Sequence, residues 1–260
     1  MKPLKSYLDE YNKIIKENKN SNIINLKKYD DLEPIVQFLL STINEKPLIN
    51  KKAVNTNENS LFIKKLEKIK YNKFFLVEDK INSYIFDLID EILISINFNG
   101  DKQSFNFICS EILMNIYKHS KFKNSVILCQ NFKEDGLIDI CFFDDGITIP
   151  GSFEKINLNF NSDYEAIINA INGQTSDKEK ENFHGRGLNT VVSITTLAFE
   201  EEILILSRKG ICLLNKHNIK MFNENSLSIN GTLILIRINN NIIKNINKYI
   251  NKLIKFNNND

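Results

Sequence analysis

The sequence predicts an α+β protein, a two-layer sandwich in which helices cover one face of a mixed, mostly antiparallel sheet. Two observations support this fold class. Apolar residues recur at helical spacing in several segments, and these segments alternate with closely spaced pairs of β-rich runs. The chain has 260 residues, of which 42% are hydrophobic and 25% charged, so it can bury a large core without disulfides or metal ions.

The individual elements follow from these periodicities. Helical spacing of apolar residues predicts helices over 3–18, 31–43, 80–97, 103–120, 187–198 and 242–257, with a shorter helical piece over 163–172. Apolar, β-rich runs predict strands over 23–26, 125–131, 137–143, 202–207, 211–215 and 231–238. The polar stretch 50–60 has the composition of a linker, so we divide the chain into an N-terminal region (1–60), a main domain (61–240) and a C-terminal amphipathic helix (241–260).

Charge and cysteine content limit the function classes. Lys and Arg number 34 against 32 Asp and Glu, a net charge of +2 that gives no reason to expect a nucleic-acid or membrane partner. The four cysteines form no CxxC pair and lie in or beside apolar runs, which predicts buried, reduced thiols at Cys109, Cys129, Cys141 and Cys212. No signal peptide opens the sequence, and no apolar stretch reaches the ~20 residues of a membrane-spanning helix. We therefore expect a cytoplasmic protein.

The predicted helix 103–120 carries a row of polar residues. At about 100° per residue, one stripe of this helix contains Glu111, Asn115, Lys118 and His119. An Asn side-chain oxygen is a suitable ligand for Mg²⁺, and a carboxylate one turn away can orient or deprotonate an attacking water or hydroxyl. The simpler interpretation is a solvated polar face, which most amphipathic helices have.

An acidic turn with a glycine follows the predicted strand 137–143. Asp144 and Gly146 stand where that strand ends, shortly before a proline that cannot continue a sheet ladder. A carboxylate at such a position, beside apolar walls, can accept a hydrogen bond from an adenine amino group. An ordinary acidic turn would have the same composition.

Glycines also mark the starts of the last predicted helix and strand of the main domain. The helix 187–198 is opened by a short loop made of Gly185, Arg186, Gly187 and Leu188. Backbone N–H groups at such a helix start bind phosphate well, although many Gly-x-Gly pairs are only turns. The pair Gly231–Thr232 at the start of the strand 231–238 carries little information by itself.

The order of these four motifs along the chain resembles the GHKL superfamily of ATPases. Glu111-x-x-x-Asn115 resembles its N-box, Asp144-x-Gly146 its first glycine box, Gly185-x-Gly187-Leu188 its second glycine box, and Gly231-Thr232 its closing GT motif. The resemblance spans residues 80–238. It implies a Bergerat fold that binds ATP together with Mg²⁺.

The resemblance implies a role for each motif residue. Asn115 would ligate Mg²⁺, and Glu111 would act as the general base. Asp144 would contact the adenine amino group, with Gly146 allowing close approach and Thr232 supporting the same edge of the base.

The resemblance also implies how the phosphates are held. They would lie along residues 185–188, and either Lys118 or His119 would reach them. The segment 151–184 would form a mobile lid over the nucleotide. Two positions depart from the family pattern in ways that affect the lid geometry more than adenine binding, because glycine is usual where this chain has Thr148 and Phe183.

The histidine content separates this chain from one class of the superfamily. A sensor histidine kinase carries a phosphoacceptor histidine well before the N-box, whereas no histidine precedes His119 here, so the chain is not a self-contained histidine kinase. The form Glu111-x-x-x-Asn115-x-x-x-His119 resembles the anti-sigma-factor serine kinases. We expect an ATP-dependent regulator that phosphorylates a Ser or Thr of a small partner, such as a STAS-type antagonist, or that changes partners on ATP binding.

Two alternative functions stay open. One is an interaction module that binds nucleotide without turnover, and the other is a simple ATPase whose activity is coupled to homodimerisation. Residues 1–60 form either an extra layer on the ATPase or an element for partner binding or dimerisation. The C-terminal helix either docks on its own domain, as terminal helices more often do, or lies on a membrane surface.

Overall fold

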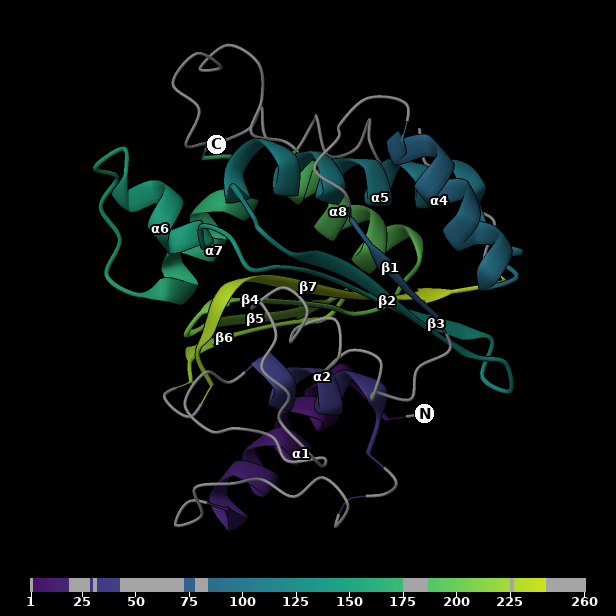
Figure 1. Ribbon diagram of the computed structural model, residues 1–260, viewed down its shortest axis with the longest axis horizontal. Coiled ribbons are helices and arrows are strands. Elements are labelled where there is room, and N and C mark those ends of the chain that lie inside the picture. The colour runs from purple at the N-terminus through teal and green to yellow at the C-terminus, as the bar shows by residue number, and fades with distance from the viewer. Residues whose placement is uncertain are drawn as a thin grey trace, which may run out of the picture.

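The computed structural model describes residues 2–18, 29, 32–42, 73–77, 84–174, 187–224 and 227–241. These residues form three layers, with a twisted sheet in the middle and helices on both of its faces (Figure 1). Within the described ranges, none of the helices has both the length and the apolar character needed to cross a membrane.

The sheet has seven strands in the spatial order β1-β2-β3-β7-β4-β5-β6. The strands are β1 (Lys73–Leu76), β2 (Ser125–Phe132), β3 (Leu137–Asp144), β4 (Ile203–Arg208), β5 (Gly210–Asn215), β6 (Asn218–Asn223) and β7 (Ile229–Asn239). The sheet is predicted to be mixed and mostly antiparallel, and the described strands pair only antiparallel. Short hairpins join three of the neighbouring pairs. β1 and β6, the two edge strands, have no counterpart among the predicted strands, because β1 has only four residues and β6 is exposed along most of its length.

The helices lie close to their predicted positions. They are α1 (Leu4–Glu17), α2 (Pro34–Thr42), α4 (Tyr84–Ser95), α5 (Lys102–Asn115), α6 (Ile149–Glu154), α7 (Asp163–Ile171) and α8 (Gly187–Ser193). α5 and α8 each continue into a π-helical turn, η2 (Ile116–Ser120) and η4 (Ile194–Ala198). α6 was not predicted. The predicted strand 23–26 and the predicted helix 242–257 lie outside the described residues.

One face of the sheet is covered by α4, α5 and α8. Alternate residues of the central strands point to this face, and Ile140, Ile205 and Ile236 are fully buried there. Phe105 and Ile112 of α5 pack into the same core. The helix with the predicted polar stripe, α5, therefore packs on this core.

The other face of the sheet is covered by α1 and α2. The intervening residues of the same strands, such as Phe143 and Leu235, pack here against Tyr11 and Phe38. The rings of Phe38 and Phe143 meet edge to face, with their centroids 5.2 Å apart. The central strands are apolar on both faces, so both faces of the sheet must be covered. The prediction placed helices on one face only, and the structure adds a third layer of helices on the other. This agrees with the extra-layer alternative for residues 1–60.

A buried ion pair ties α1 to the sheet. Asp139 of β3 stands directly opposite Arg237 of β7, and the guanidinium donates to both carboxylate oxygens at 2.7 Å. The Tyr7 hydroxyl of α1 donates to Oδ2 of Asp139 at 2.9 Å and accepts from Arg237 at 3.1 Å. Arg237 also donates to the carbonyl of Lys2 at 2.7 Å. The network therefore holds the start of α1 against the middle of the sheet.

Arg237→Ala should lower the free energy of unfolding by about 3–5 kcal/mol, because it leaves the Asp139 carboxylate buried without its cation. Tyr7→Phe removes only a hydroxyl from the same network and should cost about 1 kcal/mol. Urea denaturation followed by circular dichroism measures both losses. Equal, small losses in the two variants would contradict a structural role for the ion pair.

Candidate functional site

A row of polar residues crosses one end of the sheet. The strand registers put Asp144 of β3 opposite both Ser125 of β2 and Thr232 of β7, and put Thr232 opposite Ser207 of β4. By strand alternation this row lies on the face that α5 covers, beyond the last apolar residues of that face. The sheet thus brings two of the predicted site residues, Asp144 and Thr232, side by side.

Asp144 is buried at the end of β3, with 3% of its surface exposed. Its Oδ1 accepts a hydrogen bond from the backbone N–H of Gly146 at 3.0 Å, and the Ser120 side chain also bonds to the carboxyl group. Burial raises the pKa of Asp144 to about 7, although these two hydrogen bonds act to lower it. The carboxyl group can therefore bind or release a proton near neutral pH, and it offers an acceptor to a neutral donor such as an amino group.

The glycine turn after Asp144 packs on the end of η2. A Cβ atom at Gly146 would overlap the backbone carbonyl of Ser120, and that carbonyl accepts the N–H of Ile147 at 2.5 Å. The neighbouring Asp145 carboxylate accepts backbone N–H groups of the loop before β2, including that of Asn124 at 2.8 Å. Glycine is needed here because the two backbones touch, a packing reason separate from the close approach of a nucleotide predicted for Gly146.

The start of β7 closes the same site from the other side. Gly231 has a φ of +118°, and a Cβ atom there would overlap the backbone carbonyl of Asp144. The Thr232 hydroxyl lies 3.0 Å from that of Ser207, and Ser207 Oγ accepts the N–H of Ile149 at 2.9 Å. Ser207 is absent from the predicted site because its position depends on the pairing of β4 with β7, which no local sequence motif reveals.

A second group forms where α5 meets the start of α8. A Cβ atom at Gly187 would overlap the carboxylate of Glu111 and lie 3.8 Å from the side-chain nitrogen of Asn115. Burial raises the pKa of Glu111, which is half-buried, and Lys118 partly offsets this rise. The structure therefore brings Glu111, Asn115 and Gly187 close together.

One continuous helical segment joins the two groups. α5 passes through Glu111 and Asn115 and continues as η2 to Ser120, which contacts the turn after β3. At 1.5 Å per residue, the segment from Glu111 to Ser120 spans about 14 Å. The segment therefore sets the separation between the polar row and the group around Glu111.

The remaining predicted site residues have different surroundings. Lys118 is exposed and His119 is half-buried, both within η2. Leu188 packs into the core beneath α8, with 9% of its surface exposed. Gly185 and Arg186 lie outside the described residues.

Part of the predicted lid is packed against the sheet. The Thr148 side chain accepts the N–H of Gly151 at 3.0 Å and so caps α6. α7 begins at Asp163, which bonds to Arg208 at 3.3 Å and lies against the backbone of Gly210. The described start of the 151–184 segment is thus anchored to the β4–β5 turn, and residues 175–184 lie outside the described residues.

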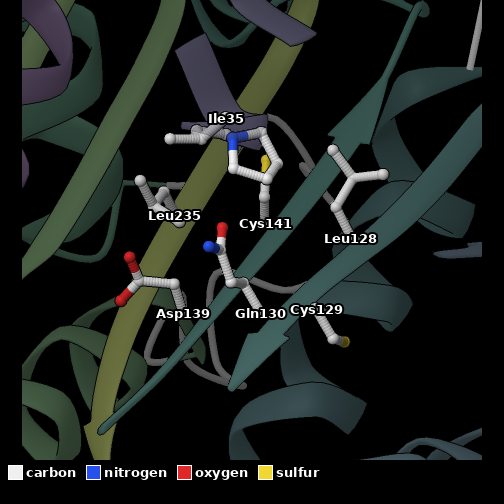
Figure 2. A pocket seen from close by; sticks show the side chains of 8 residues that line it. Ile35, Leu128, Cys129, Gln130, Asp139, Cys141 and Leu235 are labelled. Atoms are coloured by element: carbon white, nitrogen blue, oxygen red, sulfur yellow. The ribbon is translucent and has the colours of Figure 1, made fainter. Parts of the chain in front are cut away.

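Two cavities lie elsewhere in the described structure. Figure 2 shows the smaller one, on the face that α1 and α2 cover, with Ile35 and Leu235 beside Asp139. Its volume of about 20 Å³ is close to that of one water molecule, too small for a nucleotide. The larger one, of about 410 Å³, opens at the opposite end of β3 and β7 from Asp144, beside Leu137 and Arg237.

Oxygen donors for a metal ion are available at the second group. The described residues contain no cluster of three or more His, Cys, Asp or Glu side chains that could hold a metal by themselves. Mg²⁺ is commonly held by only one or two protein oxygens together with substrate phosphates and water. The Asn115 amide oxygen fits that type of site, in which phosphates and water complete the coordination.

Gly231→Ala and Gly187→Ala should differ sharply in their effect on stability. At Gly231 the new methyl group meets backbone and the φ is unfavourable, so the free energy of unfolding should fall by more than about 2 kcal/mol. At Gly187 it meets only the end of the Glu111 side chain, which can move, so the loss should stay below about 1 kcal/mol. Thermal denaturation of the two variants measures the difference. Similar losses of stability would contradict the contacts described for Gly231 and Gly187.

Asp144→Asn should stabilise the protein at pH 8. Because the folded-state pKa of Asp144 lies above its ordinary value, the wild type loses stability as the pH rises from about 4 to about 7, and the full cost is present above that range. The amide has no such cost, so the gain over the wild type should grow with pH toward at most about 4 kcal/mol. Denaturant melts from pH 4 to 8 measure this, and parallel curves for the two proteins would contradict it.

The candidate site is therefore defined by two separate groups of residues, one on β3, β4 and β7 and the other on α5 and α8. No protein-family model and no curated protein sequence matches the chain.

Proposed function

We propose that this chain binds ATP with Mg²⁺ in a GHKL-type site of Bergerat arrangement and uses the bound nucleotide to regulate a partner protein. The observation that carries the proposal is the convergence of residues from four separate motifs. Asp144 and Thr232 are register partners, and Gly187 lies against Glu111 and Asn115. These motifs are far apart in the sequence, and their order alone suggested a shared site.

The polar row is the proposed adenine end. Adenine is uncharged and carries an exocyclic amino group, so it matches a buried carboxyl group that relies on hydrogen bonds. The Asp144 carboxyl would accept from this amino group. The Thr232 hydroxyl would bond along the same edge, and the buried Ser207 hydroxyl, 3.0 Å away, holds it in place.

The group around Glu111 is the proposed phosphate end. Asn115 would supply an oxygen to Mg²⁺, which when bound neutralises phosphate charge. Lys118 is exposed on the following turn and can approach the phosphates from solvent. The loop that contains Gly185 and Arg186 would complete this end, as the motif order implies.

Glu111 is the proposed general base. Its raised pKa makes the carboxylate a stronger base than an ordinary surface glutamate. It would take the proton from a Ser or Thr hydroxyl of the partner as that oxygen attacks the terminal phosphorus, while the bond to the ADP oxygen breaks. The products are ADP and a phosphorylated partner, and a water in place of the hydroxyl would give simple hydrolysis.

Calorimetric titration with ATP and ADP, with and without Mg²⁺, tests the proposal. The wild type should bind ATP more tightly with Mg²⁺, and Asp144→Asn should weaken binding about tenfold or more, because an amide no longer offers the same acceptor. Glu111→Gln is the matched control and should retain ATP affinity while phosphate transfer or release falls by about 10²–10⁴-fold.

Each outcome of this titration has a defined meaning. No ATP binding by the folded wild type would overturn the proposal. An ATP affinity that is the same in Asp144→Asn and the wild type would show that adenine does not bind at the polar row. Equal turnover by Glu111→Gln and the wild type would remove Glu111 from the chemistry.

A further inference from the structure

Helix α4 presents an exposed apolar stripe on the outside of the molecule. Phe86 and Ile94 are 64% and 76% exposed, two turns apart on one side of the helix. The opposite side of α4, including Leu88 and Ile92, is buried in the core against α5. Figure 1 shows α4 at the outer edge of its layer. The stripe therefore offers apolar area beyond what the core needs.

The stripe is also acidic. Asp90 lies between Phe86 and Ile94, and Asp87 and Glu91 are exposed beside it. α4 contains no Lys or Arg. A segment that covers this face should combine apolar residues with positive charge.

The described chain ends next to this stripe. Asn240, just after β7, accepts the N–H of Asn99 at 2.9 Å and donates to the carbonyl of Asn97 at 3.3 Å. Asn97 in turn donates its N–H to the carbonyl of Ile94 at 3.2 Å. Residues beyond Asn241 therefore begin at the C-terminal end of α4.

The sequence that follows has the required composition. Apolar residues recur at helical spacing at Ile242, Ile246, Tyr249, Leu253 and Phe256, and lysines recur every three or four residues at Lys244, Lys248, Lys252 and Lys255. No acidic residue occurs between 242 and 259.

We propose that residues 242–257 of the same chain dock on the exposed face of α4, antiparallel to it. A chain that starts at the C-terminal end of α4 can follow the helix only in that direction. As a helix, these residues would extend about 24 Å, enough to pass the 12 residues of α4, which extend about 18 Å. A second copy of α4 would instead bring like charges together.

Hydrogen–deuterium exchange on the full-length chain tests this docking. Peptides from 242–257 should be protected in the wild type, and Asp90→Lys/Glu91→Lys should raise their exchange rate about tenfold. Adding Lys248→Glu/Lys252→Glu to that variant should restore most of the protection. Asp9→Lys, which changes an exposed aspartate of α1 across the sheet, is the matched control and should leave these peptides unchanged.

Several outcomes would overturn the proposal. Unprotected peptides in the wild type, or protection that the α4 variant leaves unchanged, would do so directly. Protection that rises with protein concentration would assign the stripe to a second copy, and protection seen only with anionic phospholipid vesicles would assign the segment to a membrane surface. The experiment contains no nucleotide, so its result is independent of the ATP proposal.

Discussion

β3 and β7 pair without interruption from Leu137 opposite Asn239 to Asp144 opposite Thr232, and both layers of helices depend on this register. On one face it sets Asp139 beside Arg237, where Tyr7 joins them. On the other face it sets the polar row under the end of η2. Since successive side chains point to opposite faces, a slip of one residue would turn Thr232 toward α1 and carry the Arg237 guanidinium into the core beneath α5.

The two buried carboxyl groups of β3 are accommodated in different ways. Asp139 has a cation as its partner, so its charge is balanced within the layer it stabilises. Asp144 has hydrogen bonds instead, and the close backbones at Gly146 and Gly231 leave little room around it. A buried carboxyl group that has hydrogen bonds but no cation as a partner lowers the stability of the fold when it is ionised. Such groups are frequent at functional sites. The proposed role of Asp144 in adenine binding would account for a carboxyl group that folding alone does not favour.

Sequence periodicity was enough to predict α5 and β3, because their apolar spacing is strong and uninterrupted. The order of the motifs was enough to choose Glu111 and Asp144 as candidate site residues. Helix packing places Glu111 beside Gly187, and strand register places Asp144 beside Thr232. Ser207 could not be predicted, because only long-range strand pairing gives it a role. The predicted helical stripe also assumed α-helical spacing throughout, whereas η2 is wider and changes the directions of the side chains that follow Asn115.

The docking of α1 has a consequence for how the chain folds as it is synthesised. Tyr7 meets Arg237 across 230 residues of sequence, and the N–H of Leu4 bonds to Glu202 across 198. The ribosome makes α1 before the strands that bury its apolar side, and these are completed only when β7 emerges. Throughout that interval the nascent chain carries an amphipathic helix without its partner surface. The yield of native protein in a cell should therefore depend on how well chaperones shield α1 during translation.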